Sequence, residues 1–158
     1  MQTSPQYPAP FIILFDGVCN LCTTSVQQVI KHDPKEKFKF AALQSKFGQQ
    51  FLAQHQLPTQ AFNTFLLIEQ NQLYTRSTAA LRVARHLSGL WPLLYIFILV
   101  PPFIRNAVYN FIAKNRHKWF GQKNQCWMPT PKLQERFLLF FLTQTTIITL
   151  FLLAHYEC

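Results

Sequence analysis

A short apolar run, followed at once by a tight turn and an amphipathic stretch, constrains this chain more than any other feature. Residues 11–15, Phe-Ile-Ile-Leu-Phe, are rich in β-formers and are closed by Asp16-Gly17. Such a run predicts a strand buried on both faces. From residue 19 to residue 32 the apolar positions recur at steps of three and four, which predicts an amphipathic helix. The chain therefore begins with a strand, a tight turn and a helix.

Similar patterns continue as far as residue 87. Alternating polar and apolar residues at 37–41 predict a half-buried strand, and apolar segments around a turn predict a hairpin of strands 62–69 and 73–75. Helices are predicted at 45–54 and 77–87, the second with Ser77 at its N-cap, a position that serine favours. The predicted order is βαβαββα, and the predicted fold class is α/β.

Two cysteines lie at the predicted start of the first helix, in the motif Cys19-Asn20-Leu21-Cys22. Unpaired backbone N–H groups and the positive end of the helix dipole favour an anion there, so we expect the thiolate form of Cys19 to be stabilised. Cys22 lies one turn deeper on the same face. We therefore predict thiol-disulfide exchange with Cys19 as nucleophile and Cys22 as resolving thiol, acting on a disulfide-containing protein or a small thiol and regenerated by an external reductant.

Asp16 lies three residues before Cys19, at the carboxyl end of the first predicted strand. It is a candidate catalytic carboxylate, because it can relay a proton to or from Cys22 or fix the loop by accepting backbone N–H groups. The structural alternative is an ordinary turn aspartate. Gly17 allows the chain to turn sharply after the strand.

The cysteines and some neighbouring residues also have structural interpretations. A structural zinc site needs four ligands, and neither Cys126, Cys158 nor the histidines form a second close pair, so no metal is expected. Two inert core thiols remain an alternative for the cysteine pair. Cys126 is a candidate accessory thiol or a buried one. Arg76 can hold a substrate carboxylate, favour the thiolate, or be a solvated helix end.

Beyond residue 88 the chain becomes more apolar. Residues 90–100 are almost wholly apolar but are interrupted by Pro92, so they are too short to span a bilayer and predict a buried or interfacial helix. A basic helix is predicted at about 103–118. Residues 137–156 carry no formal charge, and a helix of that length would reach about 30 Å. Threonines within this segment leave open both a membrane anchor and a buried terminal helix.

The net charge of +9 reflects a scarcity of acids, since charged residues make up only 13% of the chain. The hydrophobic content of 49% excludes a disordered protein. Ten cationic residues against one acidic residue lie in 71–136, beside the apolar segments. This arrangement suits an anionic membrane surface, and nucleic acid is not expected as a partner.

The 158 residues allow one compact domain with little left for a second. We expect an N-terminal extension at 1–10, a redox core at 11–88, a helical basic extension packed on that core at 89–136 and an apolar C-terminal helix at 137–158. The extension lacks the basic start and apolar run of a signal peptide. The expected location is therefore the cytoplasm, with membrane association through the C-terminal segment.

The motif Asp-x-x-Cys-x-x-Cys, carried here by Asp16, Cys19 and Cys22, resembles the signature of the DCC family of thiol-disulfide oxidoreductases. The similarity extends through residues 38–44, 74–81, 109–119 and 126–131, and covers about 11–137. The resemblance implies a thioredoxin-like fold and a disulfide reductase activity. Together with the helices predicted beyond residue 88, the expected fold is a thioredoxin-like core with additional C-terminal helices, and no cofactor is expected. It supplies no substrate.

Thioredoxin-like sites commonly have a cis-proline before the third strand, and Thr64 is expected to hold that place here. The residues between the cysteines, Asn20-Leu21, do not set the direction of exchange. A second functional hypothesis is a membrane-associated accessory protein whose cysteine pair senses redox state without turnover.

Overall fold

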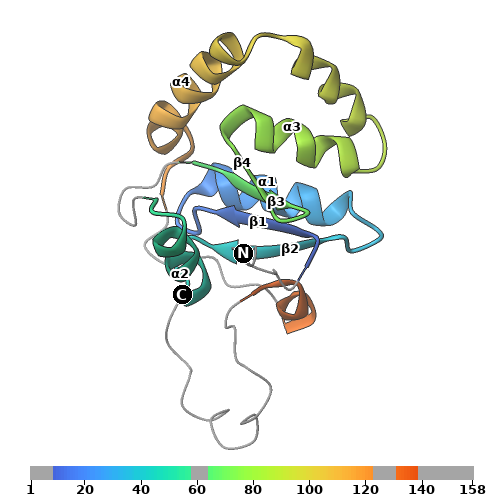
Figure 1. Cartoon of the computed structure of the whole chain (residues 1–158), viewed down its shortest axis with the longest axis vertical. Coiled ribbons are helices and arrows are strands. Elements are labelled where there is room, and N and C mark those ends of the chain that lie inside the picture. Colours follow the sequence, from blue (N-terminus) through green and yellow to red (C-terminus); the bar gives the residue numbers. More distant parts are fainter. Residues whose placement is uncertain (1–8, 58–63, 123–130, 139–158) are drawn as a thin grey trace, which may run out of the picture.

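The computed structural model describes residues 9–57, 64–122 and 131–138. Its centre is a four-stranded sheet in the order β2-β1-β3-β4 (Figure 1). β1 pairs in parallel with β2, whereas the pairs β1/β3 and β3/β4 are antiparallel. The strands are β1 (Phe11–Phe15), β2 (Phe38–Ala42), β3 (Leu66–Glu69) and β4 (Gln72–Thr75).

Three helices cover the two faces of this sheet. Alternate side chains of a strand point to opposite faces, and β1 shows this clearly. Ile13 and Phe15 pack in one buried cluster with α1 and α3, while Ile12 and Leu14 pack in another with α2. β1 is therefore buried on both faces, as its unbroken apolar sequence predicts. The helices are α1 (Asn20–Lys31), α2 (Lys46–Gln54) and α3 (Arg76–His86).

The observed order of elements confirms the predicted βαβαββα sequence and the α/β class. The hairpin between β3 and β4 turns at Gln70 and Asn71, which have φ values of 50° and 65°. Two consecutive residues with positive φ are typical of a type I′ turn, whose twist matches that of paired strands. Glu69 and Gln72 consequently face each other in register.

One predicted helix cap is wrong. α3 begins at Arg76, one residue before Ser77, and Thr75 takes the N-cap position without a side-chain hydrogen bond. The Ser77 hydroxyl is buried within the helix and donates to Asn106 Oδ1 at 2.5 Å. The Ser77 hydroxyl thus binds Asn106 of the distant helical segment instead of capping the N-terminus of α3.

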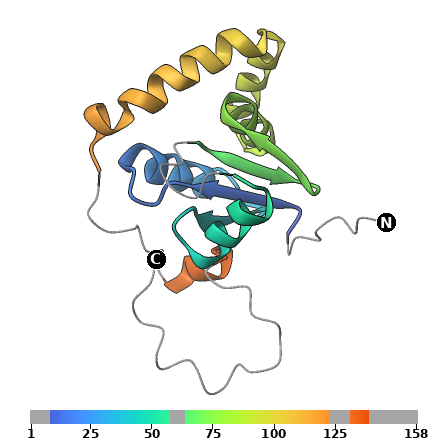
Figure 2. The ribbon, with the colours of Figure 1, turned by 60° about the vertical axis from the view of Figure 1, so that its left-hand side comes forward.

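The chain after α3 forms an arch on the side of the molecule where α1 and α3 lie (Figures 1 and 2). A 3-10 helix, η1 (Trp91–Leu99), packs against α3, and α4 (Pro102–Phe120) returns over α3 to the start of α1. η1 was predicted as a buried or interfacial helix, but it contains no buried residue. The buried alternative is therefore wrong, and the interfacial alternative stays a prediction.

The short 3-10 helix η2 (Pro131–Arg136) lies beside β2. Its Arg136 guanidinium is buried, pairs with Asp33 and donates to the carbonyl of Phe38. Phe137 packs in the core beside Phe15 and Phe40. η2 and Phe137 therefore pack against the edge of the sheet that β2 forms.

Across the parts of the chain that the structure covers, no helix is long and apolar enough to cross a membrane. The candidate anchor at 137–156 lies outside the described residues, apart from Phe137 and Leu138. The N-terminal extension is likewise described only at residues 9 and 10.

Candidate functional site

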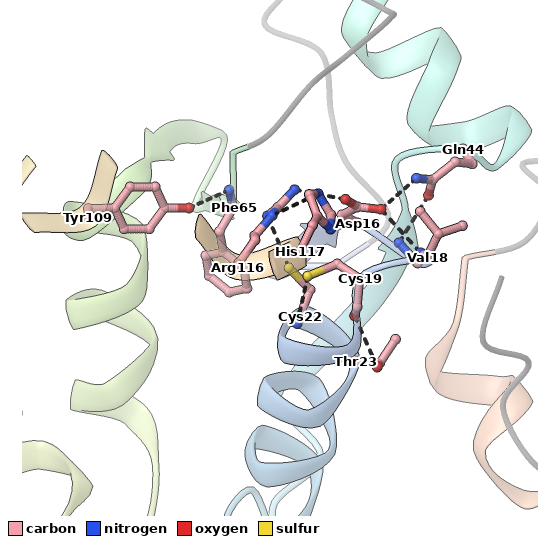
Figure 3. Close-up of polar contacts among 11 residues, drawn as sticks. Asp16, Val18, Cys19, Cys22, Thr23, Gln44, Phe65, Tyr109, Arg116 and His117 are labelled. Atoms are coloured by element: carbon pink, nitrogen blue, oxygen red, sulfur yellow. Dashed lines mark hydrogen bonds and ion pairs between the residues drawn. The ribbon is translucent and has the colours of Figure 1, made fainter. Parts of the chain in front are cut away.

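Both cysteines lie in the first turn of α1, directly after β1, and both are free thiols. Cys19 is the N-cap residue, and its Sγ accepts the backbone N–H of Cys22 at 3.4 Å (Figure 3). The first N–H groups of a helix have no intrahelical partner, so an acceptor at this position satisfies one of them. The sulfur of Cys19 therefore occupies the place where a helix favours negative charge.

A cation that is distant in the sequence lies beside the second cysteine and Asp16. Arg116 of α4 donates from Nη2 to Asp16 Oδ2 at 2.8 Å and from Nη1 to Cys22 Sγ at 3.2 Å. The side chains of Arg116 and Asp16 are only 4% and 8% exposed, so their ion pair is shielded from water. One guanidinium thus bridges the carboxylate and the second cysteine of the motif (Figure 3).

Asp16 is held on its other side by the loop that follows β2. Its Oδ1 accepts the N–H of Val18 at 3.1 Å and the Gln44 amide at 2.8 Å. Gln44 Oε1 in turn accepts the N–H of Gly17 at 3.1 Å. Asp16 therefore accepts a backbone N–H in the loop, and its action as a proton relay remains a prediction.

The two thiols differ in exposure, and Cys22 has a perturbed pKa. Cys19 has no exposed surface, whereas Cys22 is half-buried. Burial raises the pKa of the Cys22 thiol to about 12, although the Arg116 guanidinium opposes part of this effect. Cys22 consequently keeps its proton near neutral pH, and it needs a base before it can act as a nucleophile.

The segment after α4 covers Cys19. Gln122 forms an isolated antiparallel bridge with Cys19, and the Asn20 side-chain amide donates to the carbonyl of Phe120 at 2.8 Å. Gly121 between them has a φ of 75°, and a Cβ there would lie 3.3 Å from the Asn20 amide nitrogen. Residues 120–122 therefore form a short covering segment over the first cysteine.

Tyr109 of α4 connects the arch to the start of β3. Its hydroxyl oxygen accepts the N–H of Phe65 at 2.9 Å (Figure 3). Burial raises the pKa of Tyr109, and the hydrogen bond from Phe65 opposes this. The hydroxyl is therefore a neutral acceptor that links α4 to the residue before β3.

The remaining predicted site residues lie outside the turn and the helix that carry the cysteines. Thr64 is half-buried just before β3, and Arg76 is exposed at the first position of α3. No hydrogen bond or ion pair within the described ranges links Arg76 to either cysteine. Ser77 points to Asn106 of α4 instead. Cys126 lies outside the described residues.

Among the residues placed by the structure, no group of three His, Cys, Asp or Glu side chains could hold a metal ion. Sequence reasoning missed Arg116, Gln44 and Tyr109 as parts of the site. Arg116 is one of many cations in the basic half of the chain, and its residue type does not distinguish a buried cation from a solvated one. Only the similarity of segment 109–119 to the family pattern pointed to this part of α4.

Known proteins resemble this chain over most of its length. The chain matches the family described as DCC1-like thiol-disulfide oxidoreductase over residues 13–122. It is similar to the uncharacterized protein YuxK of Bacillus subtilis (strain 168), at 52% identity over 87% of this chain and 99% of the relative. It is also similar to a chloroplastic DCC family protein of Arabidopsis thaliana, at 34% identity over 73% of this chain and 67% of the relative. No solved structure matches the chain.

Proposed function

The chain belongs to the DCC1-like thiol-disulfide oxidoreductase family, and from this membership we propose that it is an enzyme that exchanges disulfides through Cys19 and Cys22. Thiol-disulfide redox chemistry is the general function that the family implies. The observation that carries the finer assignment is the N-cap geometry, in which Cys19 Sγ accepts the N–H of Cys22. Cys19 is accordingly the attacking thiol, and Cys22 is the resolving thiol.

The reaction proceeds in two exchanges. The Cys19 thiolate attacks one sulfur of a substrate disulfide, the mixed disulfide forms as the substrate S–S bond breaks, and the departing thiolate takes up a proton. Cys22 then loses its proton and attacks the Cys19 sulfur, which releases the reduced substrate and leaves a Cys19–Cys22 disulfide. An external dithiol supplies two electrons to restore the reduced pair.

Arg116 and Asp16 support the second exchange. Cys22 holds its proton tightly, with a pKa of about 12. Arg116 Nη1 lies 3.2 Å from its sulfur and stabilises the thiolate as it forms. Asp16, bound to the same guanidinium, is the nearby carboxylate proposed to relay the departing proton.

A trapping experiment tests the assignment. A Cys22→Ser chain incubated with a disulfide-bonded peptide should accumulate a stable mixed disulfide at Cys19, located by mass spectrometry, while the unaltered chain turns the peptide over. The matched Cys19→Ser chain should trap much less peptide, because Cys22 keeps its proton. Equal trapping by the two variants would contradict the assignment of Cys19 as the attacking thiol and Cys22 as the resolving thiol. Trapping at Cys19 without turnover by the unaltered chain would favour the redox-sensing accessory protein.

A specific surface feature favours a second proposal, association with an anionic lipid surface such as the cytoplasmic leaflet. Every large apolar side chain that is exposed within the described residues belongs to segment 90–120. No Asp or Glu lies between Glu69 and Glu135, whereas this stretch includes Arg105, Lys114 and Lys118. Exposed apolar groups beside cations suit binding at the headgroup region of an anionic membrane.

Cosedimentation with vesicles tests this association. The chain should bind phosphatidylglycerol vesicles more strongly than phosphatidylcholine vesicles, and a Leu93→Ser/Phe103→Ser chain should lose most of that binding. A chain ending at residue 138 separates the contribution of the C-terminal segment. Equal recovery of all chains in the supernatant would refute the proposal.

A further inference from the structure

A cavity of about 300 Å³ lies beside the cysteine pair, between α1, α3, η1 and α4. Cys22 forms part of its wall. The apolar lining comes from α1, from α3 and from residues next to β3 and α3, and it includes Val29, Phe65, Val83 and Leu87. The exposed residues Thr24, Ser25 and Gln28 of α1 form part of the polar rim. The Cys22 thiol thus faces a cavity whose wall is otherwise mostly apolar.

Two polar side chains in the wall, those of Arg116 and Tyr109, already have partners within the protein. Arg116 binds Asp16 and Cys22, and the Tyr109 hydroxyl accepts the N–H of Phe65 (Figure 3). A charged ligand that entered the cavity would lose its hydration without gaining a dedicated partner there, which is costly. An apolar group would instead gain the free energy of leaving water. The wall therefore selects for an apolar occupant.

We propose that this cavity binds a large apolar side chain of a protein substrate, next to the half-cystine that reacts. The inference rests on the proposed function and names its substrate class, a protein disulfide flanked by a leucine- or phenylalanine-sized residue. Pockets for small molecules range from about 300 to 1,000 Å³, so a cavity at the lower end of this range has room for one such side chain. A small, highly charged disulfide such as oxidised glutathione would not use the cavity.

The position of α1 connects the cavity to the reacting sulfur. Leu21 and Cys22 line the cavity, and Cys19 lies at the N-cap of the same helix. A substrate whose sulfur is joined to Cys19 can therefore cross the first turn of α1 and place a neighbouring side chain in the cavity. Cys22 would then lie close to the bound substrate when it attacks the mixed disulfide.

Two disulfide peptides that differ only beside the half-cystine test the proposal, with leucine in one and serine in the other. Because burial of a leucine side chain is worth about tenfold or more in an equilibrium constant, kcat/KM should be about tenfold higher for the leucine peptide. Oxidised glutathione serves as a third substrate, and its reduction reports only on the cysteine pair.

Filling the cavity should remove this preference. Ala80 of α3 lines the cavity but is itself exposed, so Ala80→Phe can occupy the space without disturbing the core. This variant should lower the leucine preference to about twofold or less and leave oxidised glutathione reduction unchanged. Ala53→Phe, at an exposed position of α2 away from the cavity, is the matched control and should retain the preference.

A second variant tests whether the loss of preference comes from filling the cavity and not from a change in α3 alone. Ala113 enters the cavity wall from α4, and Ala113→Phe should reproduce the loss of preference, with folding checked by circular dichroism. Equal kcat/KM values for the two peptides with the unaltered chain would overturn the cavity assignment while leaving disulfide exchange intact. Failure to reduce any of the three substrates would instead overturn the proposed function.

Discussion

Removing the guanidinium of Arg116 tests whether the corner of the site depends on a buried ion pair. Arg116→Met keeps most of the length of the side chain but leaves the Asp16 carboxylate without its cation. Both side chains are less than a tenth exposed, so water cannot replace the lost partner. Val18 N–H and the Gln44 amide still bind Asp16, but neither carries a charge.

The expected loss is large compared with the stability of a typical domain. Breaking a buried ion pair from one side costs about 3–5 kcal/mol, out of a total of about 5–15 kcal/mol. For a chain of this size each kcal/mol lowers Tm by about 2–4 °C, so Tm should fall by about 10 °C. Urea unfolding of the reduced protein, followed by circular dichroism, gives the free energy directly.

Two further variants make the test specific. Lys118→Met removes an exposed cation from the same helix, and its effect should stay within about 0.5 kcal/mol. The double variant Asp16→Asn/Arg116→Met removes both charges and should recover part of the loss, because no unpaired charge remains. A loss below about 1 kcal/mol for Arg116→Met, or a double variant that is no more stable than the single one, would refute the reasoning.

Three other outcomes follow from the same structure. Asn20→Ala removes the hydrogen bond to Phe120 that holds the covering segment 120–122. Because such a bond contributes about 1 kcal/mol, alkylation of Cys19 by iodoacetamide, followed by mass spectrometry, should become about fivefold faster. An unchanged rate would mean that the segment does not limit access to Cys19. The stability of the reduced protein should fall between pH 9 and 12, because the unfolded chain loses the Cys22 proton near pH 9.0 while the folded protein holds it to about pH 12. A Cys22→Ala chain should show a smaller fall in the urea midpoint over this range. An equal fall in the urea midpoint for the two chains would contradict the raised pKa. Ile13→Ala, at a fully buried position of β1, should cost about 2–5 kcal/mol in urea unfolding. A loss below about 1 kcal/mol would show that β1 is not tightly packed against α1 and α3.

Local patterns predicted the part of the site that is contiguous in the chain. β1, the turn at Asp16 and Gly17, and the cysteines at the start of α1 follow one another within a dozen residues. Their relative positions depend on strand alternation, helix periodicity and capping, all of which are local properties. The α/β class followed from the same kind of evidence.

Long-range partners could not be predicted in this way. Arg116 is separated from Asp16 by 100 residues and from Cys22 by 94, and nothing in its immediate neighbours distinguishes it from the exposed Lys114 and Lys118. Ser77 likewise matched a capping position, but Asn106 took its hydroxyl. In each case the path of α4 over α3 to the start of α1 decided the outcome.

The sequence by itself determined that this chain carries a cysteine pair at the start of a helix, because the apolar run, the turn and the helical period are written in consecutive residues. Only the tertiary structure decided that Cys19 is covered, that Cys22 faces an apolar cavity, and that Arg116 joins Cys22 to Asp16. The physical reason is that burial and ion pairing depend on which distant surfaces meet, and α4 brings the second half of the chain onto the first.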